Sequence, residues 1–421
     1  MKFLLNLKSS MTLTGLVLFT AISLVSGRAC AQTKAPQSQA VLQEKLQQLI
    51  VQYDIPGAVL SYKIGNGPIV TIPAGYASLS PKEKMKDDTL FLVGSITKSF
   101  TSALVLHLVD QQKVSLDESL GQIAEVYPGH IRRLVSQSPS LRGMTIRELL
   151  NHTSGIPQSI NTKTFKTEFS RDPHKYYTPE MLMNIAMQHA VYFKPGAKGK
   201  WSYTNTDYVL VGLVIEDVTR RSLADNFSQL MESLSLENVY FANRGIIPKG
   251  LSSRLANGYI PVSSTDSITK AFDNSPVVQL PSSKAQNYQF KDAYTIFSPA
   301  GGGVIASAPA LVNWYEVLLK GHSVMTEASR KELVNVVPNG KYNDAGYGLG
   351  VTVHTYPNLG KVISHDGLEP GYSSIVLYIK QKDMVVSVAT NSRIDKVSTF
   401  NVHDGAITTG LVTELLPYIN G

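Results

Sequence analysis

The chain has 421 residues, of which 43% are hydrophobic and 17% charged, and its formal net charge is +7. This length allows two domains and a large core, and the composition excludes a disordered or collagen-like chain. The excess of positive charge is not concentrated in a run of lysine or arginine, so it does not indicate a nucleic-acid-binding protein.

The first 31 residues are predicted to be a secretory signal peptide. A positively charged start precedes an apolar run over residues 13–25, and an Ala-Cys-Ala cleavage site follows. Cleavage there removes three positive charges and lowers the net charge from +7 to +4. Cys30 could instead carry the lipid of a lipoprotein, but Arg28 stands where a small uncharged residue is expected. We therefore expect an exported protein, periplasmic or secreted, with no stable membrane anchor unless Cys30 is lipidated.

Periodicity and capping residues predict the elements that follow. Residues 38–53 have the apolar spacing of a helix, and 57–64 and 69–74 are predicted strands joined by a Gly-Asn-Gly-Pro turn. A helix is then predicted to begin at Ser95. The chain from 116 to about 247 is predicted to be mainly helical, with helices at 145–150, from Thr178 onward and at 207–219.

The C-terminal part returns to strands. Residues 258–296 are polar without clear period and are predicted to be a long loop, and 298–303 a close-packed turn before a helix at 308–319. Four strands and a last helix are then predicted, at 347–356, 361–364, 372–380, 384–390 and 406–416. Strands at both chain ends predict an α+β fold: an antiparallel sheet flanked by N- and C-terminal helices, with an inserted all-helical domain. In the single domain 32–421, residues 32–94 and 340–421 form the sheet region and 95–339 the helical region.

Ser95 and Lys98 are the first candidates for chemistry. If a helix begins at Ser95, Lys98 lies one turn on, with its amine in reach of the hydroxyl. An amine can take the proton of a serine nucleophile, and N–H groups at a helix N-terminus can stabilise developing negative charge. The alternative is that Ser95 is an N-cap. The same tetrapeptide recurs at 267–270, where a polar run without apolar period predicts a loop, so the context favours the first copy.

Three motifs together carry a resemblance to a known family. Ser95-Ile96-Thr97-Lys98, Tyr203-Thr204-Asn205 and His365-Asp366-Gly367 occur in the order and at the broad spacing found in penicillin-recognising serine hydrolases. This group contains class C β-lactamases, D-Ala-D-Ala carboxypeptidases, D-aminopeptidases and related esterases, and segments 149–157 and 346–350 also resemble its signatures. Tyr-x-Asn recurs at 356–358 and 418–420, and His-Asp-Gly at 403–405, but only one choice from each set gives the family's order.

The resemblance implies a role for each matching residue. Ser95 attacks a carbonyl and forms an acyl-enzyme, and Lys98 accepts its proton, which requires an amine pKa lowered by burial and by cationic neighbours. Tyr203 relays a proton between the serine, the lysine and the leaving group, unless it is only a stacked loop residue. Asn205 orients the lysine and the substrate. The oxyanion hole consists of the backbone N–H groups of Ser95 and Leu368.

The third motif contains two departures from the commonest family pattern. His365 stands where many relatives have lysine; it is predicted to close an apolar strand, and Gly367 to let a substrate approach the strand edge. Asp366 stands where relatives that bind a terminal carboxylate have threonine or serine. An acid there repels a carboxylate, which weakens the carboxypeptidase and β-lactamase interpretations and favours a D-aminopeptidase, amidase or esterase. Trp201, Tyr208 and His152 are predicted to be structural.

The sequence therefore predicts an exported serine hydrolase without a cofactor. Its substrate is an amide or ester: a D-amino-acid peptide such as a peptidoglycan stem peptide, a β-lactam or an ester. The alternative is a binding protein that captures penicillin or cell-wall peptides without turnover. A metal hydrolase ranks third, since the nine histidines include no His-Glu-x-x-His pair, and no metal site is predicted.

Overall fold

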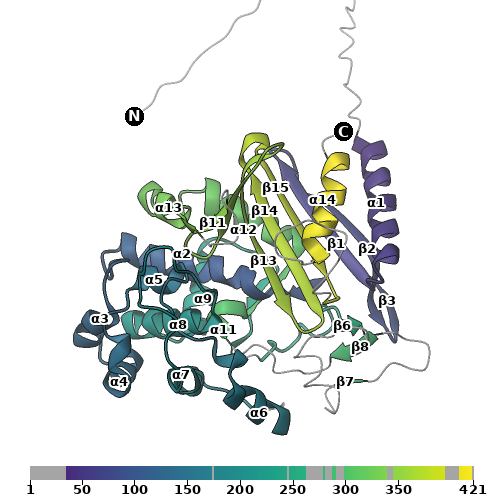
Figure 1. The fold of residues 1–421 in the computed structure, drawn as a ribbon. Coiled ribbons are helices and arrows are strands. Elements are labelled where there is room, and N and C mark those ends of the chain that lie inside the picture. The colour runs from purple at the N-terminus through teal and green to yellow at the C-terminus, as the bar shows by residue number, and fades with distance from the viewer. Residues whose placement is uncertain are drawn as a thin grey trace, which may run out of the picture.

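A nine-stranded antiparallel sheet forms the centre of the computed structural model, which describes residues 35–172, 175–243, 246–261, 278–279, 287–290, 298–338, 345–393 and 407–419 (Figure 1). The strand order is β10-β11-β12-β13-β14-β15-β1-β2-β3. The strands are β1 (Gly57–Ile64), β2 (Val70–Leu79), β3 (Lys82–Lys84), β10 (Val337–Pro338), β11 (Ala345–Tyr347), β12 (Thr352–Tyr356), β13 (Gly360–Glu369), β14 (Tyr372–Ile379) and β15 (Met384–Thr390).

Both ends of the described chain build this sheet. The N-terminal strand β1 pairs with the C-terminal strand β15, with Leu60 opposite Val388. β1 also pairs with β2 across the predicted hairpin turn, where Gly65 adopts a positive φ of 51° and donates to the carbonyl of Asp383 at 2.7 Å. Together with the helices between the strands, this pairing confirms the predicted α+β fold class.

The N- and C-terminal helices cover one face of the sheet. α1 (Ala35–Gln52) and α14 (Ile407–Ile419) lie side by side in Figure 1. α1 buries Leu42, Leu46 and Leu49 completely or almost so, and α14 buries Leu411 and Leu415. These positions follow the three-and-four spacing of one helix face, which is why periodicity alone located both helices.

A helical body packs on the other side of the sheet and carries most of the remaining core (Figure 1). Its helices are α2 (Thr97–Asp110), α3 (Leu120–Val126), α4 (His130–Gln137), α5 (Ile146–Leu150), α6 (Lys163–Arg171), α7 (Pro179–Met187), α8 (Asn205–Thr219), α9 (Leu223–Ser233), α11 (Pro299–Gly302), α12 (Ala308–Lys320) and α13 (Glu327–Leu333). The described residues also contain the 3₁₀ turns η1 (Gly94–Ile96), η2 (Pro139–Leu141) and η3 (Ser159–Asn161), and η5 (Lys380–Lys382) connects β14 to β15. Thr145 and Thr178 are the N-caps of α5 and α7, each accepting a backbone N–H of its helix.

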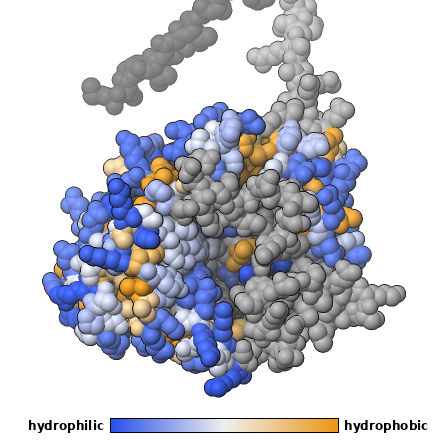
Figure 2. All heavy atoms as spheres, viewed as in Figure 1, coloured by the Kyte–Doolittle hydropathy of each residue, from blue (hydrophilic) through white to orange (hydrophobic). Residues whose placement is uncertain are grey.

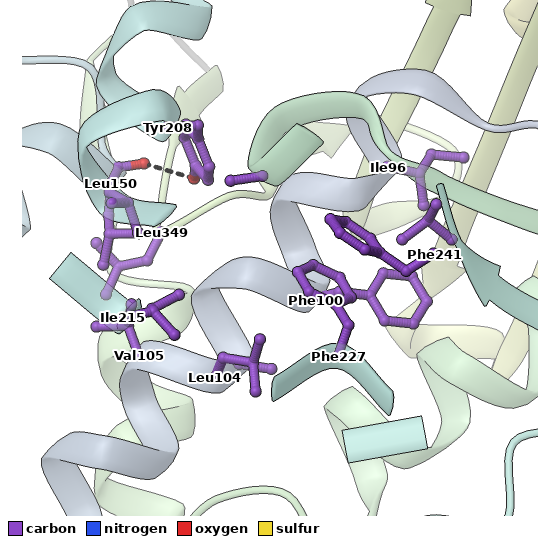
Figure 3. Close-up of a cluster of buried hydrophobic side chains, with 14 of the residues drawn as sticks. Ile96, Phe100, Leu104, Val105, Leu150, Tyr208, Ile215, Phe227, Phe241 and Leu349 are labelled. Atoms are coloured by element: carbon purple, nitrogen blue, oxygen red, sulfur yellow. Dashed lines mark hydrogen bonds between the residues drawn. The ribbon is translucent and has the colours of Figure 1, made fainter. Parts of the chain in front are cut away.

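Helix α2 runs through the middle of this body, and every residue from Thr97 to Leu106 is buried. Figure 3 shows Ile96 and Phe100 beside Phe227 and Phe241, with Leu104 and Val105 further along the helix. Phe100 also stacks on Trp314 of α12, with ring centroids 3.9 Å apart. A helix that is buried all round holds the residues at its first turn in a fixed position.

Several short strands were not predicted. β4 (Leu90–Leu92), β9 (Val304–Ser307) and β5 (Val239–Phe241) form a second sheet in the order β4-β9-β5, although β5 lies in the stretch predicted to be helical. β6 (Gly258–Pro261), β8 (Asn287–Phe290) and β7 (Val278–Gln279) form a third sheet within the stretch predicted to be a loop. Runs of two to four residues are too short to show a period. The predicted signal peptide, the second Ser-Ile-Thr-Lys and the second His-Asp-Gly lie outside the described residues.

The described surface is mostly hydrophilic on the face shown in Figure 2. Among the described residues, none of the helices is both long enough and apolar enough to cross a membrane. The same residues contain no group of three or more histidine, cysteine or acidic side chains that could hold a metal ion.

Candidate active site

Ser95 lies in a 3₁₀ turn at the entrance to α2. β4 ends at Leu92, Gly94 turns the chain with a φ of 51°, and α2 begins at Thr97, two residues later than predicted. The N-cap of α2 is Ile96, so the alternative role of Ser95 as an N-cap is wrong. The Ser95 hydroxyl is instead contacted by two other side chains.

Lys98 supplies the first of these contacts, because the turn places it three residues beyond the serine on the same side. Its Nζ lies 2.9 Å from Ser95 Oγ, 2.7 Å from Asn205 Oδ1 and 3.0 Å from the carbonyl oxygen of Gly301. The lysine is completely buried. A neutral amine can donate to Asn205 and Gly301 and still use its lone pair to accept the serine proton.

Burial lowers the pKa of the Lys98 amine from its ordinary value of 10.5 to about 7. The physical cause is that a buried ammonium loses its hydration. The expectation that cationic neighbours also lower this pKa is wrong. The charged groups that influence the pKa of this amine are the carboxyls of Glu369, Asp366 and Asp207, and they raise it.

Tyr203 supplies the second contact: its hydroxyl donates to Ser95 Oγ at 2.7 Å. The ring centroid lies 4.8 Å from Lys98 Nζ. Tyr203 directly precedes α8, whose N-cap Thr204 accepts from Thr206 N. Ser95, Lys98 and Tyr203 therefore form a connected group, with each polar atom at hydrogen-bonding distance from the serine.

Asn205 is the first residue of α8, and two contacts fix its position. Gln158 Oε1 accepts its backbone N–H at 2.7 Å, and its backbone carbonyl accepts from Ser298 Oγ at 3.2 Å. The neighbouring carbonyl of Gly301 is held by α2, because Thr101 Oγ1 donates to Ala300 O at 2.6 Å. Sequence reasoning missed Gly301, since a backbone acceptor leaves no sequence signal beyond the glycine run.

Strand β13 passes directly beside the nucleophile turn. A Cβ on Gly94 would lie 2.7 Å from Leu368 N, and a Cβ on Gly367 would lie 1.9 Å from Val93 O. Glycine is therefore required at both positions for the two backbones to approach. At Gly367 the approaching group is Val93 of the same chain, whereas the sequence analysis expected a substrate.

The half of β13 that carries the third motif forms an edge of the sheet. β12 pairs with β13 only from Gly360 to Ser364, whereas β14 pairs with it from Val362 to Glu369. The strand thus continues five residues past the predicted end at Ser364, and His365 lies within it and does not close it. Leu368 lies on this edge, next to Gly94 and the serine turn.

His365 is buried at 3% exposure, with both ring nitrogens in hydrogen bonds. Nδ1 lies 2.6 Å from the carbonyl oxygen of Asp366, and Nε2 lies 2.9 Å from the Tyr347 hydroxyl. A carbonyl can only accept, so Nδ1 carries a proton and donates to Asp366 O, and Nε2 accepts from Tyr347 when the ring is neutral. The imidazole ring centroid is 6.5 Å from that of Tyr203. His365 thus borders the tyrosine, and Asp366 beside it is half-buried.

Tyr347 and Glu369 were not predicted as site residues. Tyr347 lies in the Gly346–Gly350 segment that resembles a family signature, which is the signal that could have identified it. Glu369 is buried beside Gly302, and burial raises the pKa of its carboxyl to about 8. Tyr208 packs in the core and donates to Leu150 O at 3.0 Å, as Figure 3 shows, in agreement with its predicted structural role.

Comparison with known proteins identifies relatives over most of the chain. The family model described as Beta-lactamase matches residues 42–401. Penicillin-binding protein 4* of Bacillus subtilis (strain 168) is 25% identical over 321 residues, which cover 74% of this chain and 63% of the relative. The chain thus spans less than two thirds of the length of that curated relative.

Solved structures with the same fold include two amide hydrolases. The D-stereospecific amidohydrolase from Streptomyces sp. is 25% identical with a TM-score of 0.68, and the match covers 89% of this chain and 97% of the other. The D-amino acid amidase from Ochrobactrum anthropi SV3, complexed with D-phenylalanine, is 22% identical with a TM-score of 0.72 and covers 90% and 99%. The second likeness shows the fold alone.

Proposed function

The chain belongs to the Beta-lactamase family, and on that premise we propose that it is a serine hydrolase that forms an acyl-enzyme on Ser95. The observation that supports this most directly is the hydroxyl of Ser95, which contacts both Lys98 Nζ at 2.9 Å and the Tyr203 hydroxyl at 2.7 Å. An amine with a pKa of about 7 is neutral in half of the molecules at neutral pH. It can therefore act as the general base.

The reaction follows from this geometry. Ser95 Oγ attacks the substrate carbonyl carbon while its proton moves to Lys98 Nζ. The N–H groups of Ser95 and Leu368 stabilise the negative charge on the carbonyl oxygen, and each such donor contributes about 2.7–4 kcal/mol of barrier lowering. Tyr203 passes a proton to the leaving nitrogen or oxygen. Water then attacks the ester on Ser95, and the serine oxygen regains its proton from Lys98 and Tyr203.

We propose an amide or ester of a D-amino acid, without a free carboxylate near β13, as the substrate. Asp366 is half-buried on the part of β13 that does not pair with β12, and the carboxyls of Asp366 and Glu369 both raise the pKa of Lys98. A substrate carboxylate placed beside Asp366 meets repulsion, whereas an amide, an ester or a free amine does not. The D-stereospecific amidohydrolase from Streptomyces sp., which has this fold at 25% identity, supports the same class. We further propose that residues 1–31 direct the protein out of the cytoplasm.

The duplicated tetrapeptide provides a matched control for the test. Ser95→Ala and Ser267→Ala make the same change in the same local sequence, Ser-Ile-Thr-Lys. Incubation with a fluorescent penicillin or an activated ester, followed by intact-mass measurement, is expected to show one acyl group per molecule in the wild type and in Ser267→Ala. Ser95→Ala is expected to show none. Acylation that survives in Ser95→Ala refutes the proposal.

A binding protein without turnover is the second candidate, because one relative is named a penicillin-binding protein. Burst kinetics distinguish the two. A hydrolase releases product continuously after the first turnover, whereas a binder stops after one acylation per molecule. A panel of nitrocefin, D-Ala-D-Ala peptides, D-amino-acid anilides and short esters then identifies the substrate.

A further inference from the structure

A buried pair of ionisable residues lies behind Tyr203 and is not used in the proposed reaction. His152 Nδ1 and Asp207 Oδ2 are 2.9 Å apart, and both side chains are completely buried. The second oxygen of Asp207 accepts from Ser154 Oγ at 2.5 Å. Burying two such groups is costly unless each satisfies the other, so a pair at this depth needs a physical reason.

The chain around His152 holds the segment that carries Tyr203. Ser202 N donates to His152 O at 3.1 Å, and Thr204 N approaches His152 Nδ1 at 3.5 Å. Both neighbours of Tyr203 in the sequence therefore contact this one histidine. Asp207 connects His152 to helix α8 as well, because Asp207 belongs to the first turn of α8, which begins two residues after Tyr203.

The imidazole ring of His152 also packs on the tyrosine ring itself. Its centroid lies 4.4 Å from that of Tyr203 and 4.9 Å from that of Tyr347. Its Nε2 atom is buried and has no hydrogen-bond partner within the described residues. His152 further adopts a φ of 64°, which costs a non-glycine residue about 1–3 kcal/mol. An unsatisfied atom and a strained backbone at one residue are typical of functional positions.

Burial also shifts the ionisation of both members of the pair. Burial raises the pKa of the Asp207 carboxyl and lowers the pKa of the His152 imidazole. Both shifts favour the uncharged forms of the two side chains. An unpaired carboxylate in the same place would favour the charged form of Lys98 and oppose its role as base.

We propose that His152 and Asp207 form a positioning pair that holds the Tyr203 hydroxyl against Ser95. The pair acts through Tyr203 and does not touch the substrate. This inference rests on the proposed function, since it assigns the pair to the acylation step. It predicts that the histidine matters for acylation only as long as Tyr203 has a hydroxyl to position.

A double-mutant cycle tests this dependence. His152→Asn keeps a residue that tolerates a positive φ and removes the imidazole ring. It is expected to slow acylation about 100-fold, the scale expected for an ångström-sized misplacement of a reacting group. In the Tyr203→Phe background the same change is expected to slow acylation further by less than about 3-fold, because contacting residues that act as a unit are not additive. Equal losses in both backgrounds overturn the proposal.

Thr153→Ala is the matched control for general damage to this turn. Thr153 is buried next to His152, and its hydroxyl bonds only within the turn, donating to Asn151 Oδ1 at 2.7 Å. Its loss is expected to reduce the melting temperature without slowing acylation more than about 3-fold. A 100-fold loss of acylation in Thr153→Ala would show that the turn, and not the pair, is responsible.

A structural readout keeps this inference separate from the proposed function. In a crystal structure of His152→Asn, the Tyr203 hydroxyl is expected to move beyond hydrogen-bonding distance from Ser95 Oγ, from 2.7 Å in the present structure. An unmoved tyrosine overturns the positioning pair, whatever reaction the protein catalyses. Acylation of Ser95→Ala refutes the proposed function. The position of the Tyr203 hydroxyl in His152→Asn remains a separate test of the positioning pair.

Discussion

The neutral amine of Lys98 gives the most direct test of the site, through the pH dependence of acylation. An amine with the ordinary pKa of 10.5 is neutral in about one molecule in 3,000 at pH 7. With the pKa lowered to about 7 it is neutral in half of them. Burial therefore increases the population of the competent base about 1,500-fold at neutral pH.

Single-turnover acylation by an activated ester, measured in a stopped-flow instrument between about pH 5 and 9, reports this population. Below the pKa the rate is expected to fall about tenfold per pH unit, and above about pH 8 it is expected to level off. Lys98→Arg is expected to abolish acylation nearly as fully as Lys98→Ala, since a guanidinium does not give up its proton. Substantial turnover by Lys98→Arg contradicts the general-base role.

Glu369 is the group most easily confused with Lys98 in this profile, because burial raises the pKa of its carboxyl to about 8. Glu369→Gln removes that titration. The increase in acylation rate with pH is expected to persist in Glu369→Gln. It is expected to occur at the same pH or at a lower one, because the carboxyl of Glu369 raises the pKa of Lys98 in the wild type. A profile that becomes flat in Glu369→Gln, or that is flat in the wild type, refutes the reasoning.

Two further predictions concern stability and substrate choice. The unfolded chain keeps the Lys98 proton up to pH 10.5, whereas the folded protein loses it above about pH 7, so stability rises with pH between these values. From pH 7 to 9 the wild type is expected to gain about 2 kcal/mol of unfolding free energy relative to Lys98→Met in urea titrations, and parallel pH curves would contradict this. Asp366→Thr is expected to raise kcat/KM for D-Ala-D-Ala peptides relative to D-amino-acid amides by about tenfold or more, because it removes a charge that repels carboxylates. An unchanged ratio removes Asp366 from the account of specificity.

Much of the fold could be predicted because its long elements have a clear period. α1, α8, α12, β14 and β15 were located within a few residues. The errors fall on the strands of two to four residues, such as β5 and β9, which are strands only because each pairs with a partner far along the chain. β13 was predicted to end at Ser364, since the polar residues His365 and Asp366 interrupt its apolar run.

The sequence by itself determined which residue types and motifs are available, and it placed Lys98 one turn from Ser95, because that contact depends only on local geometry. The tertiary structure alone decided what surrounds the amine. Its partners Asn205 and Gly301 lie 107 and 203 residues away, and its burial, which lowers its pKa, comes from helices and strands distributed along the chain. The same holds for His152, which sequence analysis interpreted as structural. Hydration and long-range contact are properties of the packed molecule, and no pattern of neighbouring residues contains them.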